Sequence, residues 1–190
     1  MDGGSEMAPE LGPLAGLEGT WEGEKGTDTA PDDDRVSREI NKYRERMTFE
    51  TTGLVENHEQ KLYGLRYRTT AWRLGEDEPF HEELGYWLWD AGAKQVLRCF
   101  MVPRGVTVLA GGTAEPDARS FELAAELGSQ TYGICSNRFL DREFKTLSYE
   151  LRFEKRDANT IHYWEDTVLK IQGQDEPFHH TDENTLSRVG

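Results

Sequence analysis

The five histidines of this chain are its main candidates for functional residues, because an imidazole can carry a proton or ligate a metal near neutral pH. They are His58, His81, His162, His179 and His180. His58 stands in a polar run and is expected at the surface. His162 stands between two apolar residues and is expected to be a satisfied strand residue. The other three carry the functional hypotheses.

The segment from His81 to Trp89 reads HEELGYWLW. Strand parity places His81, Glu83, Gly85, Trp87 and Trp89 on one face. Such a face suits the wall of a cavity that a flat ligand approaches, with Gly85 leaving room for the plane of that ligand. The alternative is a barrel face on which the histidine and the glutamate meet water at the rim, and the pattern leaves both readings open.

His179 and His180 follow Asp175-Glu176-Pro177-Phe178, where the last strand is expected to have ended. Adjacent residues point in different directions on any regular backbone, so at most one of the two can enter a cavity. A histidine held by a loop at a barrel mouth is placed to ligate a metal from one side. The alternative is a histidine pair at the surface.

Other reactive constellations are missing from the sequence. No serine, histidine and acid set is arranged for nucleophilic catalysis, and no glycine-rich phosphate loop follows a strand. The run Asp32-Asp33-Asp34 lacks the spacing of a calcium-binding EF-hand loop, which favours a solvated loop. Cys99 and Cys135 form no CxxC pair, which favours two buried thiols in a reducing cytoplasm. The residues therefore indicate a binding cavity, and any catalysis would come from a bound cofactor.

The elements that must position these residues are almost all strands. Period-two alternation recurs along the chain at intervals of roughly 10–15 residues, with glycine and proline turns between the runs. It predicts a long strand over 138–155 and a strand over 160–171, a loop over 26–37, a short helix over 12–17 and one helical turn after Asp182. The pattern favours an all-β fold, a closed antiparallel β-barrel of about ten strands with a short N-terminal helix and a ligand cavity.

The composition sets the outer limits. With 190 residues, the chain is predicted to form a flexible N-terminal tail over 1–10 and one β-barrel domain over 11–190. The absence of a secretory signal and of an apolar run of about 18 residues predicts a cytoplasmic protein that does not bind membranes. The net charge of −14 argues against nucleic-acid binding. The expected partner is a small molecule in the barrel cavity.

Three motifs together resemble the nitrobindins, a family of haem-binding β-barrels related to the fatty-acid-binding proteins. The run LEGTWEG over 17–23 is similar to the opening Gly-x-Trp-x-Gly of that family, although Glu24-Lys25-Gly26 inserts one residue after it. His81-x-Glu83-x-Gly85-Tyr86 is similar to its His-x-Glu-x-Gly-Tyr strand. The third feature is a histidine close to the C-terminus.

The resemblance implies one ferric haem b at the open end of the barrel, bound by a single axial histidine. His180 is the first choice for this ligand and His179 the second, while His81 lies near the haem. Gly85, Trp87 and Trp21 are the further expected contacts of the cofactor, and Trp21 is also expected to plug the narrow end of the barrel.

The family activity that follows is binding of nitric oxide or peroxynitrite, with isomerisation of peroxynitrite to nitrate. The alternative, by analogy of barrel shape, is a metal-free carrier of an apolar small molecule. That hypothesis relies on four aromatic residues as cavity walls, namely Trp72, Tyr86, Trp87 and Trp89.

Overall fold

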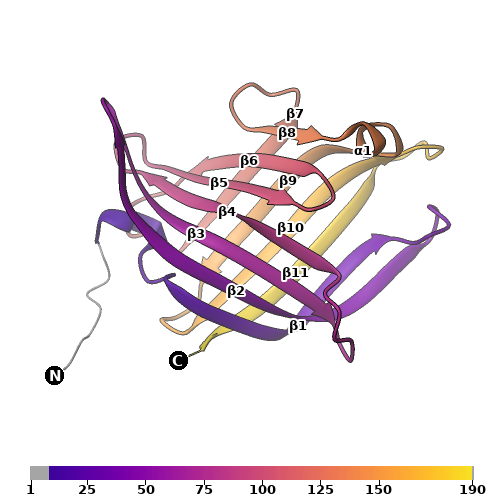
Figure 1. Ribbon diagram of the computed structural model, residues 1–190, viewed down its shortest axis with the longest axis horizontal. Coiled ribbons are helices and arrows are strands. Elements are labelled where there is room, and N and C mark those ends of the chain that lie inside the picture. The colour runs from indigo at the N-terminus through magenta and orange to yellow at the C-terminus, as the bar shows by residue number, and fades with distance from the viewer. Residues whose placement is uncertain (1–8, 190) are drawn as a thin grey trace.

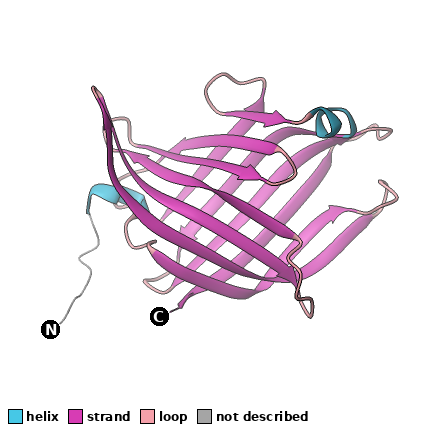
Figure 2. Ribbon diagram, viewed as in Figure 1, coloured by secondary structure: helices cyan, strands magenta, loops and turns pink. Residues whose placement is uncertain are grey.

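The computed structural model describes residues 9–189, which form a closed β-barrel with a short helical segment near each end (Figures 1 and 2). The elements in chain order are a 3₁₀ helix η1 (Pro9–Leu14), β1 (Gly19–Pro31), β2 (Arg38–Asn57), β3 (Gln60–Arg73), β4 (His81–Asp90), β5 (Gln95–Val102), β6 (Val106–Thr113), β7 (Ser120–Leu127), β8 (Gly133–Ser136), α1 (Arg138–Glu143), β9 (Phe144–Lys155), β10 (Thr160–Ile171) and β11 (Phe178–Val189).

Neighbouring strands pair antiparallel around the barrel except for β7 and β8, and β11 closes the barrel by pairing with both β10 and β1. The predicted all-β fold, with its closed barrel and short N-terminal helix, is confirmed. The structure has eleven strands, because the four-residue β8 lies between β6 and β7 and runs parallel to β7. Closure leaves the first and last strands without free edges, which removes the sites where open sheets aggregate.

One end of the barrel is packed shut. Leu11 and Leu14 of η1 are buried with Leu17 against Trp21, whose indole Nε1 donates to the carbonyl of Leu17 at 2.8 Å. Trp21 therefore plugs this end, as its position at the start of the first strand predicts. The helix spans 9–14 and not the predicted 12–17. Residues 1–8 lie outside the described residues, so the predicted tail stays a prediction there, although Glu10 belongs to η1.

Two predicted boundaries in the first and third quarters of the chain are wrong. The region 26–37 is not all loop, because β1 continues to Pro31 and only 32–37 connect it to β2. The segment 138–143 is helix α1, not the start of a long strand. The side chain of Asn137 accepts hydrogen bonds from the amides of Phe139 and Leu140 at 3.0 Å each. This N-cap favours a helix at 138–143 instead of an extended strand.

The prediction for the C-terminus is also wrong. β11 is continuous from Phe178 to Val189, so His179 and His180 lie inside a strand, and no helical turn follows Asp182. The sequence of β11 hides its strand character because its inward positions include His180, Asp182 and Asn184, which are polar. Its pairing with two neighbours, not its own alternation, makes it a strand.

Candidate functional site

A cavity of about 550 Å³ occupies the half of the barrel away from η1. Its volume lies within the range of roughly 300–1,000 Å³ that is typical of ligand and cofactor sites. Its mouth is bordered by the β1–β2 loop, by Phe80 before β4, by Arg104 in the β5–β6 turn and by Leu140 of α1. The barrel is thus packed at one end and hollow at the other.

The cavity has an apolar wall and a polar wall. The apolar wall comes from β5, β6, α1 and the start of β9, and consists of Phe100, Val102, Val106, Val108, Leu140 and Phe144. The polar wall comes from β1, β2, β4, β10 and β11 together with Arg98 of β5, and it includes Asp28, Glu45, Glu83, Glu165, His180 and Asp182. A ligand in this space meets hydrocarbon on one side and ionisable groups on the other.

His180 faces the cavity from β11. Its Nε2 lies 2.7 Å from Oδ1 of Asp28 on the adjacent β1, and the side chain is 34% exposed. Asp28 is only 5% exposed, and its Oδ2 accepts a hydrogen bond from Asn41 at 3.0 Å. Burial alone would raise the pKa of Asp28, but the hydrogen bond and charge of His180 outweigh it, so the pKa is lowered. Asp28 is therefore an ionised carboxylate, and it contacts Nε2 of the His180 imidazole, which faces the cavity.

His179 points the opposite way. Its side chain is 61% exposed on the outer face of the barrel, where Nδ1 lies 2.6 Å from Oδ2 of Asp166. The alternation of the strand thus separates the two adjacent histidines, and only His180 enters the cavity. His58 lies at the exposed tip of the β2–β3 hairpin, and His162 shares a hydrogen bond with Thr185 at 3.1 Å, which confirms both expectations.

His81 lines the same cavity from the start of β4. Burial lowers the pKa of its imidazole, although the carboxylate of Glu165 opposes this effect. His81 is therefore a neutral imidazole at neutral pH, able to donate from one nitrogen and accept at the other. Glu83, on the same face, also lines the cavity and is buried among polar groups. The first two inward residues of β4, His81 and Glu83, are therefore part of the cavity wall.

Trp21, Gly85 and Trp87 lie in the packed half and do not border the cavity. A Cβ on Gly85 would lie 1.9 Å from the carbonyl oxygen of Cys99, so glycine is required there by the close approach of β5. The ring of Trp87 packs against four aromatic rings with centroids 5.1–6.1 Å away, those of Phe49, Tyr67, Phe121 and Phe153. Contact of these three residues with a cofactor stays a prediction.

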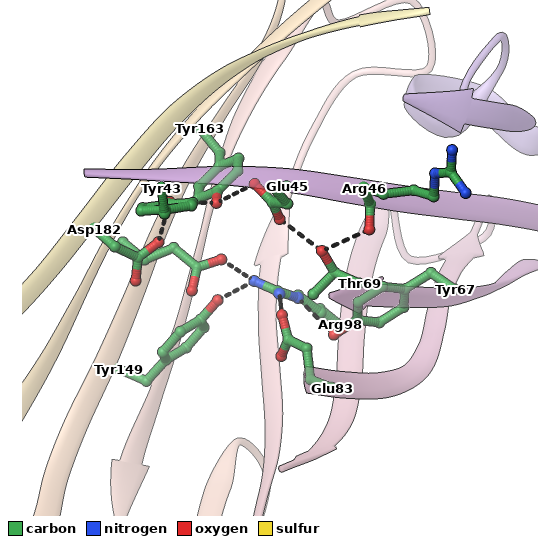
Figure 3. Close-up of polar contacts among 11 residues, drawn as sticks. Tyr43, Glu45, Arg46, Tyr67, Thr69, Glu83, Arg98, Tyr149, Tyr163 and Asp182 are labelled. Atoms are coloured by element: carbon green, nitrogen blue, oxygen red, sulfur yellow. Dashed lines mark hydrogen bonds and ion pairs between the residues drawn. The ribbon is translucent and has the colours of Figure 1, made fainter. Parts of the chain in front are cut away.

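The centre of the polar wall is Arg98 of β5, which is 1% exposed (Figure 3). Its guanidinium donates to Glu83 at 2.6 Å, to Tyr67 at 3.1 Å, and to Tyr149 and Glu165. Burial alone would lower the pKa of Arg98, but Glu165 and Glu83 more than offset this, and the pKa is raised. The buried cation is thus paired with two carboxylates and two phenols.

A second buried group surrounds Glu45 of β2, which is 4% exposed and accepts only from neutral donors (Figure 3). Its carboxylate receives hydrogen bonds from Thr69 at 2.6 Å, Tyr163 at 2.7 Å and Asn184 at 3.1 Å. Tyr163 in turn shares a hydrogen bond with Tyr43 at 2.8 Å. Burial raises the pKa of Glu45 to about 7, because no cation lies against it to stabilise the charge.

Sequence reasoning missed Asp28, Glu45 and Arg98. A signal exists for two of them, because Glu45 stands between Tyr43 and Met47, and Arg98 between Val96 and Phe100, at inward positions of strands. A charged residue in phase with an apolar face predicts a buried polar group. Asp28 gives no such signal, because a bulge in β1 shifts its phase.

Within residues 9–189, no group of three or more histidine, cysteine, aspartate or glutamate side chains could hold a metal ion by itself. This leaves the possibility of a metal inside a prosthetic group, for which one protein ligand suffices. No helix in the described part of the chain is long and apolar enough to span a membrane.

The chain matches the model of the family described as "THAP4-like, heme-binding beta-barrel domain" over residues 10–188. It is 37% identical over 84 residues to a protein of Leifsonia xyli named peroxynitrite isomerase, and 36% identical over 87 residues to a ferric nitrobindin-like protein of Thermobifida fusca. Each match covers 44% of this chain and only 37% and 41%, respectively, of those relatives.

Among solved structures, Rv2717c of M. tuberculosis has the same fold. It superposes with a TM-score of 0.68 over 97% of this chain and 100% of its own, at 20% sequence identity. At that level of identity the likeness supports the barrel architecture and nothing about the ligand.

Proposed function

Since the chain belongs to the THAP4-like haem-binding β-barrel family, we propose that it binds ferric haem b in the cavity, with His180 as the single axial ligand of the iron. The observation that carries this proposal is the opposite orientation of two adjacent histidines, with His180 facing the hollow and His179 facing outward. The single inward imidazole on β11 supports the proposal of one axial histidine.

The residues present fit a haem in three respects. The apolar wall, with Phe100, Val108 and Phe144, offers a surface for a flat macrocycle. The imidazole of His180 is held by a carboxylate, as iron-ligating histidines commonly are. Arg35, Arg73 and Arg104 border the mouth and could pair with the propionates of a haem whose edge faces outward.

When bound, the haem would supply an iron able to take up nitric oxide or peroxynitrite, and we propose isomerisation of peroxynitrite to nitrate as the reaction. The name of the Leifsonia xyli relative supports this choice of substrate. The protein's own contribution would be to hold the iron from one side through His180 and to offer the neutral imidazole of His81 as a hydrogen-bonding group within the same cavity.

Reconstitution with haem tests the axial ligand. In the His180→Ala variant we expect the Soret band to shift and the affinity for ferric haem to fall by more than about 100-fold, since loss of a ligand exceeds loss of a group behind it. The matched control is His179→Ala, which removes an adjacent imidazole from the outer face and should leave the spectrum unchanged. A spectrum indifferent to both substitutions would contradict the proposal.

The alternative of a metal-free carrier of an apolar molecule has less support. Tyr86 is exposed on the outer face, Trp72 stacks under the guanidinium of Arg44, and Trp87 and Trp89 are packed in the closed half. None of these rings borders the cavity, and a hydrocarbon ligand would form no hydrogen bonds with its polar wall. The prediction of two buried thiols is wrong, because Cys135 is exposed and Cys99 is only half-buried. Both cysteines are free, which supports our further proposal of a cytoplasmic location.

A further inference from the structure

We infer that Asp28 is a positioning residue for His180: it fixes the imidazole against the cavity wall and sets its strength as a ligand, an inference that rests on the proposed function. Asp28 lies 2.7 Å from Nε2 of His180. A carboxylate that accepts the N–H of a ligating imidazole selects the tautomer, restrains the ring and makes the other nitrogen more basic.

Asp28 is itself held by a chain of hydrogen bonds behind it. Asn41 of β2 donates to Asp28 at 3.0 Å, and Arg73 of β3 donates from Nε to Asn41 at 2.8 Å. The four side chains come from β11, β1, β2 and β3, which are consecutive around the barrel. They connect His180 to a guanidinium at the cavity mouth, so the carboxylate has little freedom to leave the imidazole.

A β-bulge turns Asp28 inward. The register of β1 shifts between Glu22 and Thr27 against β11, and between Gly23 and Gly26 against β2. Trp21 and Asp28 both face the interior although they are seven positions apart, an odd number that regular alternation would place on opposite faces. Bulges are a recurrent means of re-aiming a side chain beside a functional site. The residue inserted after Gly23 therefore turns Asp28 to the inner face, where its carboxylate contacts His180.

The hydrogen bond also decides which nitrogen remains for iron. With Nε2–H donated to Asp28, the lone pair of His180 is on Nδ1, which leaves that nitrogen as the one able to ligate a metal. The outer face offers an internal comparison, because Asp166 makes the same kind of contact with His179 at 2.6 Å, through Nδ1. Two carboxylate–histidine pairs thus stand on opposite faces of neighbouring strands, and only one faces the cavity.

The test compares Asp28→Asn and Asp28→Ala with Asp166→Asn in the full chain loaded with haem. For Asp28→Asn we expect ferric-haem affinity to fall about 10-fold to 100-fold, with a larger loss for Asp28→Ala. The iron–histidine stretching band of the ferrous form should move to lower frequency, and the iron reduction potential should rise, because the imidazole loses anionic character. Asp166→Asn should change none of these quantities.

His180→Ala separates the two proposals. If it abolishes histidine ligation while Asp28→Asn leaves affinity, stretching band and potential unchanged, the positioning role is overturned and the axial ligand stands. Tighter haem binding in Asp28→Asn would also overturn it, since Asp28 would then compete with the iron. If His180→Ala has no effect on the haem, both proposals fail.

Thermal unfolding of the apo variants controls for misfolding. Should both Asp28 variants fail to fold, Asn41→Ala provides the second route, because it removes only the group that orients the carboxylate. It should shift the stretching band in the same direction by a smaller amount. An unshifted band in a folded Asn41→Ala protein would then overturn the inference.

Discussion

At the scale of single residues, the interior of the barrel balances charge in two different ways. Arg98 is a buried cation that forms ion pairs with Glu83 and Glu165, whereas Glu45 is a buried acid that accepts hydrogen bonds only from neutral donors. Burying an unpaired charge is unfavourable, and the usual response is a shift of pKa toward the neutral form. The stability of this protein should therefore depend on pH through the protonation of Glu45.

The sign of that dependence follows from the raised pKa. Glu45 has a pKa of about 7 in the folded chain against 4.5 ordinarily, so the folded state holds its proton over a range in which the unfolded state has lost it. Its contribution to stability is full below pH 4.5 and is lost as pH rises through 7. We expect Glu45→Gln to stabilise the protein at pH 8 by about 2–3 kcal/mol and by much less at pH 5.

Urea unfolding at the two pH values measures this difference. The amide of Glu45→Gln can accept from Tyr163 and Asn184 and donate to Thr69, whose hydroxyl can turn toward the carbonyl of Arg46 at 3.3 Å. Glu122→Gln is the matched control, because Glu122 is exposed and its substitution should change stability by less than about 0.5 kcal/mol at either pH. Equal effects of Glu45→Gln at pH 5 and pH 8 would contradict the assignment.

Sequence reasoning reached part of this picture. Parity placed His81 and Glu83 on the inner face of their strand, because alternation depends only on neighbouring residues. It could not pair Arg98 with Glu165, since the contact joins positions 67 residues apart and depends on barrel register. It also left His179 and His180 undecided, because the choice between them depends on the register of β11 against β1 and β10.

At the scale of elements, the strands with clear alternation were predicted well and the polar ones were not. β10 spans Thr160–Ile171, as predicted, because apolar inward residues stand at both of its ends, Ile161 and Tyr163 at one and Leu169 and Ile171 at the other. β11 was missed because it faces the polar wall, and α1 was missed because its six residues are too few for a helical period to show. The bulge in β1 could not be derived from alternation, since it breaks alternation.

The role of Gly85 in β4 also could not be derived from alternation, because it depends on the neighbouring strand. The sequence suggested that Gly85 leaves room for a ligand, whereas a Cβ there would lie 1.9 Å from the Cys99 carbonyl oxygen of the paired strand. We expect Gly85→Ala to destabilise the apo protein by about 1–3 kcal/mol, because β4 and β5 must separate.

The control for Gly85→Ala is Gly92→Ala, where the nearest atom is 3.4 Å from the added Cβ and little should change. Unfolding of both variants in denaturant, without haem, gives the comparison. A Gly85→Ala protein of unchanged stability but impaired haem binding would instead restore the ligand-room interpretation.

At the scale of the whole molecule, the barrel consists of a packed half and a hollow half. The packed half holds Trp21, Phe49 and Trp87 beneath η1, and the hollow half is bounded by loops and α1. The β2–β3 hairpin extends beyond the packed end, and residues 51–61 in it are exposed. The free energy of local unfolding should therefore be higher in the packed half than in the hollow half, because more apolar contacts must break there before an amide can exchange.

Hydrogen exchange followed by mass spectrometry tests this division. In the apo protein we expect the slowest exchange around Trp21 and Trp87, and the fastest in 32–37 and 51–61. Haem should slow exchange around the mouth, at 28–37, near Phe80 and at 140–146, because those segments border the cavity. The packed half and the hairpin tip should be unaffected, since neither borders the cavity. Protection that instead spread over the packed half, or that persisted equally in His180→Ala, would place the haem elsewhere than in the hollow and remove the structural basis for ligation by β11.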